Sequence, residues 1–267
     1  MSETDTVYVL QAPTEAWVAA SEVQIPNRAM NFGDGLFETM VFDGASIRFF
    51  DFHLERLRQG MELLQIEGFD SRFYDLETWI RERFSGRQLR VRWNVYRAGA
   101  GKYTPEVEGA CQTLHLQPFA PAPAVKGKTS FAEEVSLFPF PWSACKTLSA
   151  LPYVMAAQER RKRGLDELIL ADYRGKISEA SSSNIFWRRG KKVYTPALGC
   201  GCIAGVGRRA ILEKIPRLVT EGAFGANELL GAEQVWTSNV TGVSYLEKID
   251  SVEFSTEPWE PLLEIFE

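Results

Sequence analysis

The stretch PFAPAPAVKGK at 118–128 is the feature that most constrains how this chain folds. Its closely spaced prolines lack a backbone N–H and fix φ, so they favour an extended backbone and interrupt any hydrogen-bond ladder. A chain of 267 residues is long enough for two small domains. We therefore predict a smaller N-terminal α/β domain at 1–118, an interdomain linker at 119–126 and a larger C-terminal domain at 127–267.

Hydrophobic periodicity predicts a mixed α/β order of elements before this linker. Alternating apolar residues indicate strands, and a 3.6-residue repeat after Asp51, an N-cap residue type, indicates a helix. The expected elements are strands at 6–10 and 17–25, a hairpin at 36–50 turning at Asp43-Gly44, a helix at 51–68, a helix at 73–84, and strands at 89–97 and 111–119.

The C-terminal part also mixes helices and strands. Pro152 suits the first turn of a helix at 151–164, and a basic run before Gly164 suits the negative end of its dipole. The further expected elements are three strands within 167–196 with turns at Arg174-Gly175 and Arg189-Gly190, a helix at 205–215, a short helix at 226–232 and strand structure at 234–249.

Composition excludes several classes of protein. Hydrophobic residues make up 45% and charged residues 24%, and no apolar run approaches the roughly 18 residues of a membrane span. The N-terminus lacks the pattern of a secretory or transit peptide, so we expect a soluble, cytoplasmic protein without a membrane partner. The net charge of −5 argues against a broad nucleic-acid surface, although one small anion could bind locally.

The four cysteines and two histidines do not form a recognisable metal motif. Cys200 and Cys202 are one residue too close for the usual zinc spacing, and no second cysteine pair follows. His53 and His115 show no partner spacing. We predict structural thiols, structural histidines and no bound metal.

Five segments occur in an order that resembles the fold-type IV (class IV) pyridoxal-phosphate enzymes. They are NRAMNFGDGLFETM, HLERL, KTL, DELILADYRGKISEASSSNIFW and GVGRRAILE. The resemblance covers nearly the whole chain. It implies a two-domain α/β fold of the D-amino-acid aminotransferase type, with pyridoxal 5'-phosphate bound mainly by the larger domain.

The resemblance assigns Lys146 of KTL as the catalytic lysine that bonds to the cofactor aldehyde. A lysine reacts in this way only when a useful fraction is unprotonated, which burial or a neighbouring positive charge favours. The small residues before it, Ser143, Ala144 and Cys145, leave room for a cofactor. The alternative is a helix-entry lysine whose amine reaches solvent.

Glu179 is expected, by the same resemblance, to pair with the pyridine nitrogen of the cofactor. A carboxylate there keeps the nitrogen protonated, so the ring accepts electrons from the substrate α-carbon. Ser183 and Asn184, which end the run SSSN, are expected to orient the ring. A solvated strand-end glutamate followed by a polar turn is the alternative.

The cofactor phosphate requires positive charge and oriented N–H donors. Arg56 of HLERL matches the family's phosphate-binding arginine, and the glycine-led helix at 205–215 offers its N-terminal amides. Many relatives carry threonine at the position of Gly207, so backbone donors and the TSN segment have to compensate. A helix-surface charge is the alternative for Arg56. The expected phosphate-site residues are Arg56, Gly205, Val206, Gly207, Ser238 and Asn239.

Three residues are expected to bind the substrate. Phe37 stands where several relatives carry tyrosine, so it offers an apolar wall without a hydroxyl. Arg97 and Tyr103 belong to the loop YRAGAGKYTP. An arginine there either clamps a substrate carboxylate or holds the loop in shape.

These features favour an aminotransferase acting on a branched-chain or D-amino acid and a 2-keto acid. The first alternative is 4-amino-4-deoxychorismate lyase, which releases pyruvate; the glycine-rich loop favours it, whereas KTLSALP lacks the Asn-Arg pair often found after the lysine in lyases. A cofactor-free binding protein on the same fold is a remote alternative. The resemblance also implies a homodimer.

Overall fold

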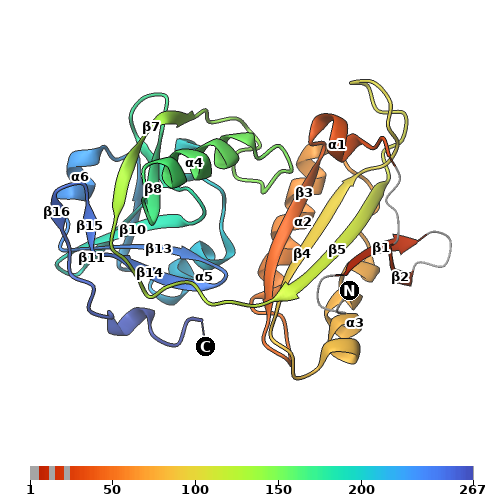
Figure 1. Cartoon of the computed structure of the whole chain (residues 1–267), viewed down its shortest axis with the longest axis horizontal. Helices are drawn as coiled ribbons and strands as arrows, with labels where there is room; N and C mark the ends of the chain where they lie inside the picture. The colour runs from red at the N-terminus through yellow and green to blue at the C-terminus, as the bar shows by residue number, and fades with distance from the viewer. Residues whose placement is uncertain (1–5, 12–15, 21–24, 267) are drawn as a thin grey trace. The chain divides into compact units, whose positions relative to one another are not determined.

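Figure 1 shows the computed structural model of the chain, which describes residues 6–11, 16–20 and 25–266. The chain forms two compact units. Unit 1 comprises Met1–Ala120 with Cys145–Ala150, and unit 2 comprises Pro121–Ala144 with Leu151–Glu267. The linker predicted at 119–126 includes the short strand β6 (Val125–Lys126).

Unit 1 is built on one antiparallel sheet with the strand order β2-β1-β5-β4-β3. Its strands are β1 (Val7–Gln11), β2 (Ala16–Ala19), β3 (Gly35–Phe42), β4 (Leu89–Arg97) and β5 (Ala110–Pro118). Its helices are α1 (Arg28–Phe32), α2 (Phe50–Leu64) and α3 (Asp75–Phe84), with a 3-10 turn at Ser71–Phe73.

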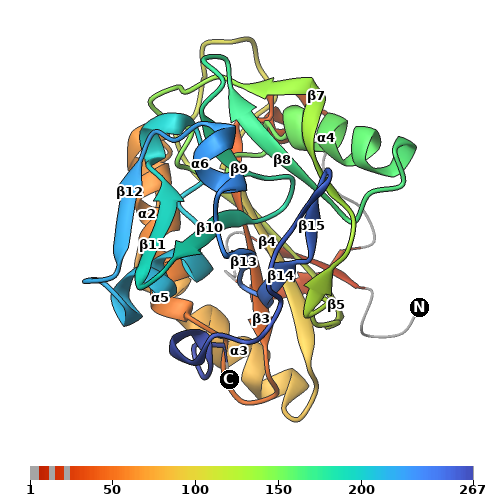
Figure 2. The ribbon, with the colours of Figure 1, turned by 90° about the vertical axis from the view of Figure 1, so that its left-hand side faces the viewer.

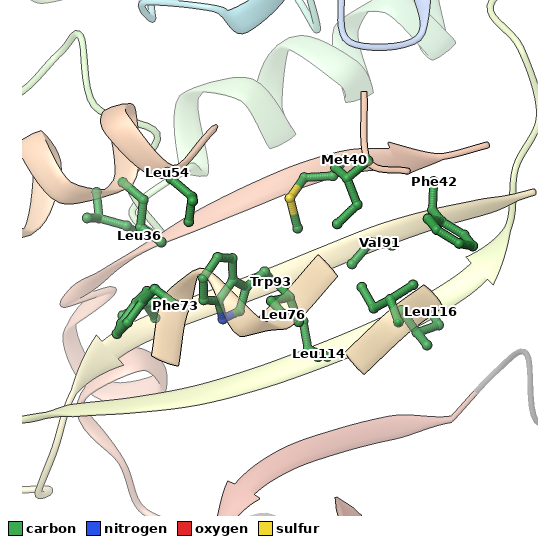
Figure 3. Packing of buried hydrophobic residues seen from close by; sticks show 14 of the residues in the cluster. Leu36, Met40, Phe42, Leu54, Phe73, Leu76, Val91, Trp93, Leu114 and Leu116 are labelled. Atoms are coloured by element: carbon green, nitrogen blue, oxygen red, sulfur yellow. The ribbon is translucent and has the colours of Figure 1, made fainter. Parts of the chain in front are cut away.

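The core of unit 1 lies between this sheet and the helices α2 and α3, which cover one face of it (Figure 2). Alternate residues of β3 and β4 point into this core, as period-2 patterning requires. Figure 3 shows Trp93 of β4 packed beside Phe73 and Leu76. The Trp93 indole N–H donates to Gln112 at 3.1 Å, so its one polar atom is satisfied.

Three local features of unit 1 differ from the sequence predictions. The expected hairpin lacks its second strand, because only Ile47 bridges back to Phe42 before α2 begins at Phe50. Asp51 lies in the first turn of α2, and the N-cap is Phe49. Helix α1 was not predicted, because its five residues are too few for a periodic signal.

Strand β2 ends at Ala19, whereas a strand was predicted at 17–25; positions 21–24 of that prediction lie outside the described residues.

Unit 2 contains a six-stranded sheet, β12-β11-β10-β13-β14-β6, and a five-stranded sheet, β16-β15-β7-β8-β9. Beyond β6, the strands are β7 (Thr129–Leu137), β8 (Glu167–Asp172), β9 (Ile177–Ala180), β10 (Asn184–Arg189), β11 (Lys192–Pro196), β12 (Val219–Gly222), β13 (Gln234–Asn239), β14 (Gly242–Leu246), β15 (Lys248–Ile249) and β16 (Val252–Glu253).

The helices of unit 2 pack against these sheets. The helices are α4 (Leu151–Lys162), α5 (Val206–Lys214) and α6 (Ala226–Leu230), with 3-10 turns at Leu198–Cys200 and Glu260–Leu262. Helix α4 lies against β7 and β8 (Figures 1 and 2), and α5 contacts β13. Within the described ranges, no helix combines the length and apolar composition that would let it cross a bilayer.

The stretch 167–196 holds four strands rather than the three predicted. The extra turn falls at Ser181–Ser183, between β9 and β10, where the serine run was expected to orient the cofactor. Strands β7 and β12 were not predicted. Strand β7 carries Glu133 and Glu134 at its centre, and two adjacent charges hide the alternation that marks a strand.

Candidate active site

Lys146 is held by its own backbone at the edge of the unit 1 sheet. The N–H of Phe37 donates to the carbonyl of Lys146 at 2.8 Å, and the N–H of Leu148 donates to the carbonyl of Gly35 at 2.8 Å. Strand β3 is the last strand of its sheet, so its outer hydrogen-bonding groups are available for this pairing. The segment that carries Lys146 is therefore fixed without help from its side chain.

The side chain of Lys146 lies beside an aromatic ring. Its Nζ is 4.5 Å from the centroid of the Phe37 ring, and the guanidinium carbon of Arg92 is 3.9 Å from the same centroid. Phe37 thus brings two cationic side chains to one ring. Arg92 was not singled out from the sequence.

A buried network joins Glu38 of β3 to His53 and Arg56 of α2. The Nε and Nη2 atoms of Arg56 both donate to the Glu38 carboxylate, the former at 2.8 Å, and His53 Nδ1 lies 2.6 Å from Glu38 Oε2. Because His53 and Arg56 are three residues apart on α2, they present to the same side of the helix. Arg56 is therefore mostly buried and ion-paired, which excludes the interpretation as a helix-surface charge.

The charges of this network set its protonation. Burial by itself would raise the pKa of Glu38, but Arg56 and His53 lower it to about 2. Burial lowers the pKa of His53 in spite of the adjacent Glu38, and the charges of Arg56 and Lys146 act in the same direction as burial. His53 is therefore neutral near pH 7 and donates its Nδ1 proton to the ionised Glu38.

Arg97 and Tyr103, predicted to bind substrate, make other contacts in unit 1. The guanidinium of Arg97 bonds to the carboxylates of Asp34 and Glu108 and to the carbonyls of Leu64 and Gln65. These contacts support the alternative in which Arg97 holds the loop in shape. Tyr103 is 89% exposed, and its ring centroid is 5.5 Å from that of Phe32.

In unit 2, the Glu179 carboxylate is buried and accepts three hydrogen bonds. The Tyr153 hydroxyl donates to Oε1 at 2.5 Å, the Ile203 N–H donates to the same oxygen at 3.2 Å, and Asn184 Nδ2 donates to Oε2 at 3.2 Å. Only 3% of Glu179 is exposed, so it is not the solvated strand-end glutamate of the alternative interpretation. Three donors stabilise an ionised carboxylate and fix its orientation.

The phosphate-site residues predicted in the C-terminal domain meet at the amino end of α5. Asn184 pairs with Ser238 across β10 and β13, and Asn239 Nδ2 donates to Ser183 Oγ at 3.0 Å. Asn239 is held in turn by Thr241, whose N–H and hydroxyl both donate to its Oδ1. Two turns, one before β10 and one after β13, are thereby tied together beside the first turn of α5.

The close approach of these turns leaves little room for a side chain at Gly205, the N-cap of α5, and none at Gly207 without a shift of the backbone. A Cβ on Gly205 would lie 2.1 Å from Asn184 Oδ1, and a Cβ on Gly207 would lie 2.6 Å from the carbonyl oxygen of Asn239. The threonine that many relatives carry at the position of Gly207 would therefore collide with the backbone of the β13–β14 turn.

We expect Gly207→Ala to lower the free energy of unfolding by about 1–3 kcal/mol, because the added methyl forces the turn away from α5. Gly199→Ala is the matched control: no atom lies within 4 Å of its Cβ, so its effect should stay within about 0.5 kcal/mol. Urea denaturation followed by tryptophan fluorescence measures both. Equal effects of the two substitutions would contradict this account.

A buried ion pair holds the turn between β9 and β10 in place. Lys126 Nζ donates to Glu167 Oε2 at 2.7 Å, and Glu167 Oε1 accepts both the N–H and the hydroxyl of Ser181. Glu167 is fully buried, and Lys126 is 8% exposed. The segment predicted as a linker therefore also supplies a side chain that orders the serine run.

Cys200 and Cys202 are buried free thiols. Burial, and then the charge of Glu179, raise the pKa of Cys202 to about 12. The described part of the chain contains no cluster of three or more His, Cys, Asp or Glu side chains that could hold a metal ion.

The unit 2 residues fit a phosphate-bearing pyridine. Helix α5 begins without a side-chain cap, so the N–H groups of its first turn have no intrahelical acceptor. The buried Ser238 Oγ has no hydrogen-bond partner among the described residues, and it lies 2.9 Å from where a Gly207 Cβ would be. Oriented donors at the uncapped end of α5 suit an anion, and the Glu179 carboxylate suits a protonated ring nitrogen.

The family follows from comparison with known proteins. The model of the family described as Amino-transferase class IV matches residues 35–246. The chain belongs to this family, and it is an enzyme, an aminotransferase or a lyase of the same family.

One curated relative and two solved structures illustrate the similarity. Aminodeoxychorismate lyase of Bacillus subtilis (strain 168) is 28% identical over 248 residues, which are 86% of this chain and 82% of the relative. The structure of 4-amino-4-deoxychorismate lyase from Pseudomonas aeruginosa has a TM-score of 0.80 at 24% identity and covers 90% of this chain and 92% of that one.

The structure of branched-chain amino acid aminotransferase from Escherichia coli has a TM-score of 0.81 at 19% identity. The match covers 95% of this chain and 89% of that one. Together with the family match, these structures confirm the predicted fold-type IV architecture.

Proposed function

We propose that the protein is a pyridoxal-phosphate-dependent aminotransferase that transfers an amino group between a branched-chain or D-amino acid and a 2-keto acid. The observation that carries this proposal is the buried Glu179 carboxylate, oriented by three donors beside the uncapped end of α5. A carboxylate held in this orientation can form a charge-assisted hydrogen bond with a protonated pyridine nitrogen.

Each proposed role follows from the chemistry of the side chain. Pyridoxal phosphate, when bound, supplies an aldehyde and a ring that accepts electrons. Glu179 holds the proton at the ring nitrogen, while Arg56 and the first turn of α5 bind the phosphate. Lys146 Nζ moves the proton to and from the substrate α-carbon as general base and acid. Phe37 confines the amine of Lys146 on one side.

We propose that the phosphate is bound at the start of α5 by backbone N–H groups and the Ser238 hydroxyl, and that Ser183 and Asn184 orient the ring. The proposed phosphate-site residues of unit 2 are Gly205, Val206, Gly207, Ser238 and Asn239. The family match supports pyridoxal phosphate as the cofactor. The residues were assigned from the resemblance to the class IV pyridoxal-phosphate enzymes, and the family model describes the same class.

A second candidate is 4-amino-4-deoxychorismate lyase, with the same Lys146, Glu179 and phosphate-binding residues. Its specific support is the identity of 28% to the Bacillus subtilis lyase over most of both chains. The glycine-rich loop YRAGAGKYTP also favours it, because this loop resembles that of the lyases.

The aminotransferase and the lyase differ in which substrates change the absorbance spectrum of the bound cofactor. For an aminotransferase, adding an amino acid alone converts the absorbance of the bound cofactor to that of its aminated form, and a 2-keto acid restores it. For the lyase, amino acids leave the spectrum unchanged, and pyruvate is released from aminodeoxychorismate. A preparation that stays colourless with added pyridoxal phosphate would overturn both and leave the cofactor-free binding protein.

The predicted homodimer and cytoplasmic location remain proposals. Two stacked aromatic pairs on the surface of unit 2 support a dimer: Phe138 with Tyr173, and Phe140 with Trp142. All four side chains are exposed. Exposed aromatic groups of this kind are enriched at interfaces between protein chains.

A further inference from the structure

Tyr153 makes the shortest of the three hydrogen bonds to Glu179. It stands in the first turn of α4, and its ring packs against the buried cluster of Leu137, Ala156, Leu168 and Leu170. Ring packing on one side and the carboxylate on the other fix the direction of the hydroxyl, whose oxygen lies 2.5 Å from Glu179 Oε1. An O–H donor at this distance from a carboxylate forms a charge-assisted bond, about twice as strong as one between neutral groups.

The hydroxyl of Tyr153 acts only as a donor. Burial, and then the negative charge of Glu179, raise the pKa of Tyr153. Cys202 also acts on the pKa of Tyr153, and it stays a neutral thiol because its own pKa is raised to about 12. The raised pKa keeps the proton on Tyr153 at neutral pH, where its hydroxyl donates to Glu179.

We propose that Tyr153 is a positioning residue that keeps Glu179 ionised and oriented, and so keeps a proton on the ring nitrogen of pyridoxal phosphate. The inference rests on the proposed function, in which Glu179 pairs with that nitrogen. A donor that stabilises the carboxylate makes it a weaker base, so the shared proton stays on the nitrogen. Without the donor, the carboxylate becomes more basic and competes more strongly with the nitrogen for the shared proton.

The first test needs no cofactor. In apoprotein with 13C-labelled glutamate carboxyls, the Glu179 signal, assigned by its loss in Glu179→Gln, gives a titration midpoint. Tyr153→Phe removes the donor and keeps the ring, so the midpoint should rise by about one pH unit. Tyr173→Phe is the control, because Tyr173 is 60% exposed and stacks on Phe138. An unchanged midpoint in Tyr153→Phe would overturn the proposal.

The second test uses the loaded protein and pyridoxal phosphate labelled with 15N in the ring. The chemical shift of the nitrogen should be that of a protonated pyridine in the wild type and in Tyr173→Phe. In Tyr153→Phe it should move toward the deprotonated value. If the 15N chemical shift is the same in Tyr153→Phe as in the wild type, the proposal is rejected, even if the titration midpoint of Glu179 in the apoprotein has changed. Failure to bind pyridoxal phosphate would instead reject the proposed function, and the apoprotein titration would still decide whether Tyr153 controls Glu179.

Discussion

Lys146→Ala is expected to abolish covalent attachment of pyridoxal phosphate and to reduce kcat by about 10³-fold or more, the range lost with a general acid–base group. Alanine keeps the backbone pairing of residues 146–148 with β3, since that pairing uses only main-chain atoms. The variant should therefore fold normally. Treatment with pyridoxal phosphate and borohydride, followed by peptide mapping, should label the peptide containing residue 146 in the wild type and leave it unlabelled in Lys146→Ala.

Lys191→Ala is the matched control for this experiment. Lys191 is an exposed lysine in the turn between β10 and β11, and it should be neither labelled nor required. A label that persists in Lys146→Ala, or that appears on another lysine of the wild type, would show that a different amine carries the chemistry.

Glu38→Gln is expected to lower the free energy of unfolding by about 3 kcal/mol at pH 7, because it leaves the mostly buried Arg56 without its counter-charge. Glu62→Gln provides the comparison, because Glu62 lies on α2, the helix that carries Arg56. Glu62 pairs with Arg58 at an exposed position, so its loss should change stability by no more than about 0.5 kcal/mol. Chemical denaturation of both variants measures the difference, and similar values for the two would refute the role given to the buried network.

The same network predicts how stability depends on pH. The pKa of Glu38 is lowered from 4.5 to about 2 on folding. A lowered carboxyl pKa contributes stability that is present above pH 4.5 and is lost as the pH falls toward 2. His53 acts in the same direction at higher pH. Its pKa is lowered from 6.5, so below that value the unfolded chain takes up a proton that the folded chain excludes.

Denaturation curves between pH 7 and 3 should therefore show stability falling in two stages. His53→Gln should flatten the first stage, just below pH 6.5, and Glu38→Gln should flatten the second, below pH 4.5. A wild-type stability that is constant from pH 7 to 5 would contradict a neutral, buried His53.

Much of the fold was readable from local patterns. Helix α3, strands β4 and β5 and helix α5 lie within a residue or two of their predicted bounds, because long periodic segments carry strong signals. The failures are short or mixed elements. The segment after Asp43-Gly44 enters α2 where a second strand was expected, and β7 has charges at its centre. In both cases tertiary packing outweighed the local pattern.

The candidate site divides in the same way. Its residue types were readable from motif order: Lys146, Glu179, Arg56 and the glycines of α5 all stand in segments that the family shares. Their supports were not readable. The contact of Tyr153 with Glu179 and that of Glu38 with Arg56 each join two elements whose relative positions cannot be read from the sequence. The same holds for the Asn239 carbonyl beside Gly207.

The sequence by itself determined the family, the order of most elements and the identity of the reactive groups, because these depend on residue types at fixed spacings. Only the tertiary structure decided that Arg56 is neutralised by Glu38, that Arg97 is bonded within its own unit, and that Tyr153 holds Glu179. The physical reason is that hydrogen bonds and ion pairs act over about 3 Å in space. Side chains far apart in the chain come within that distance only once the sheets have formed.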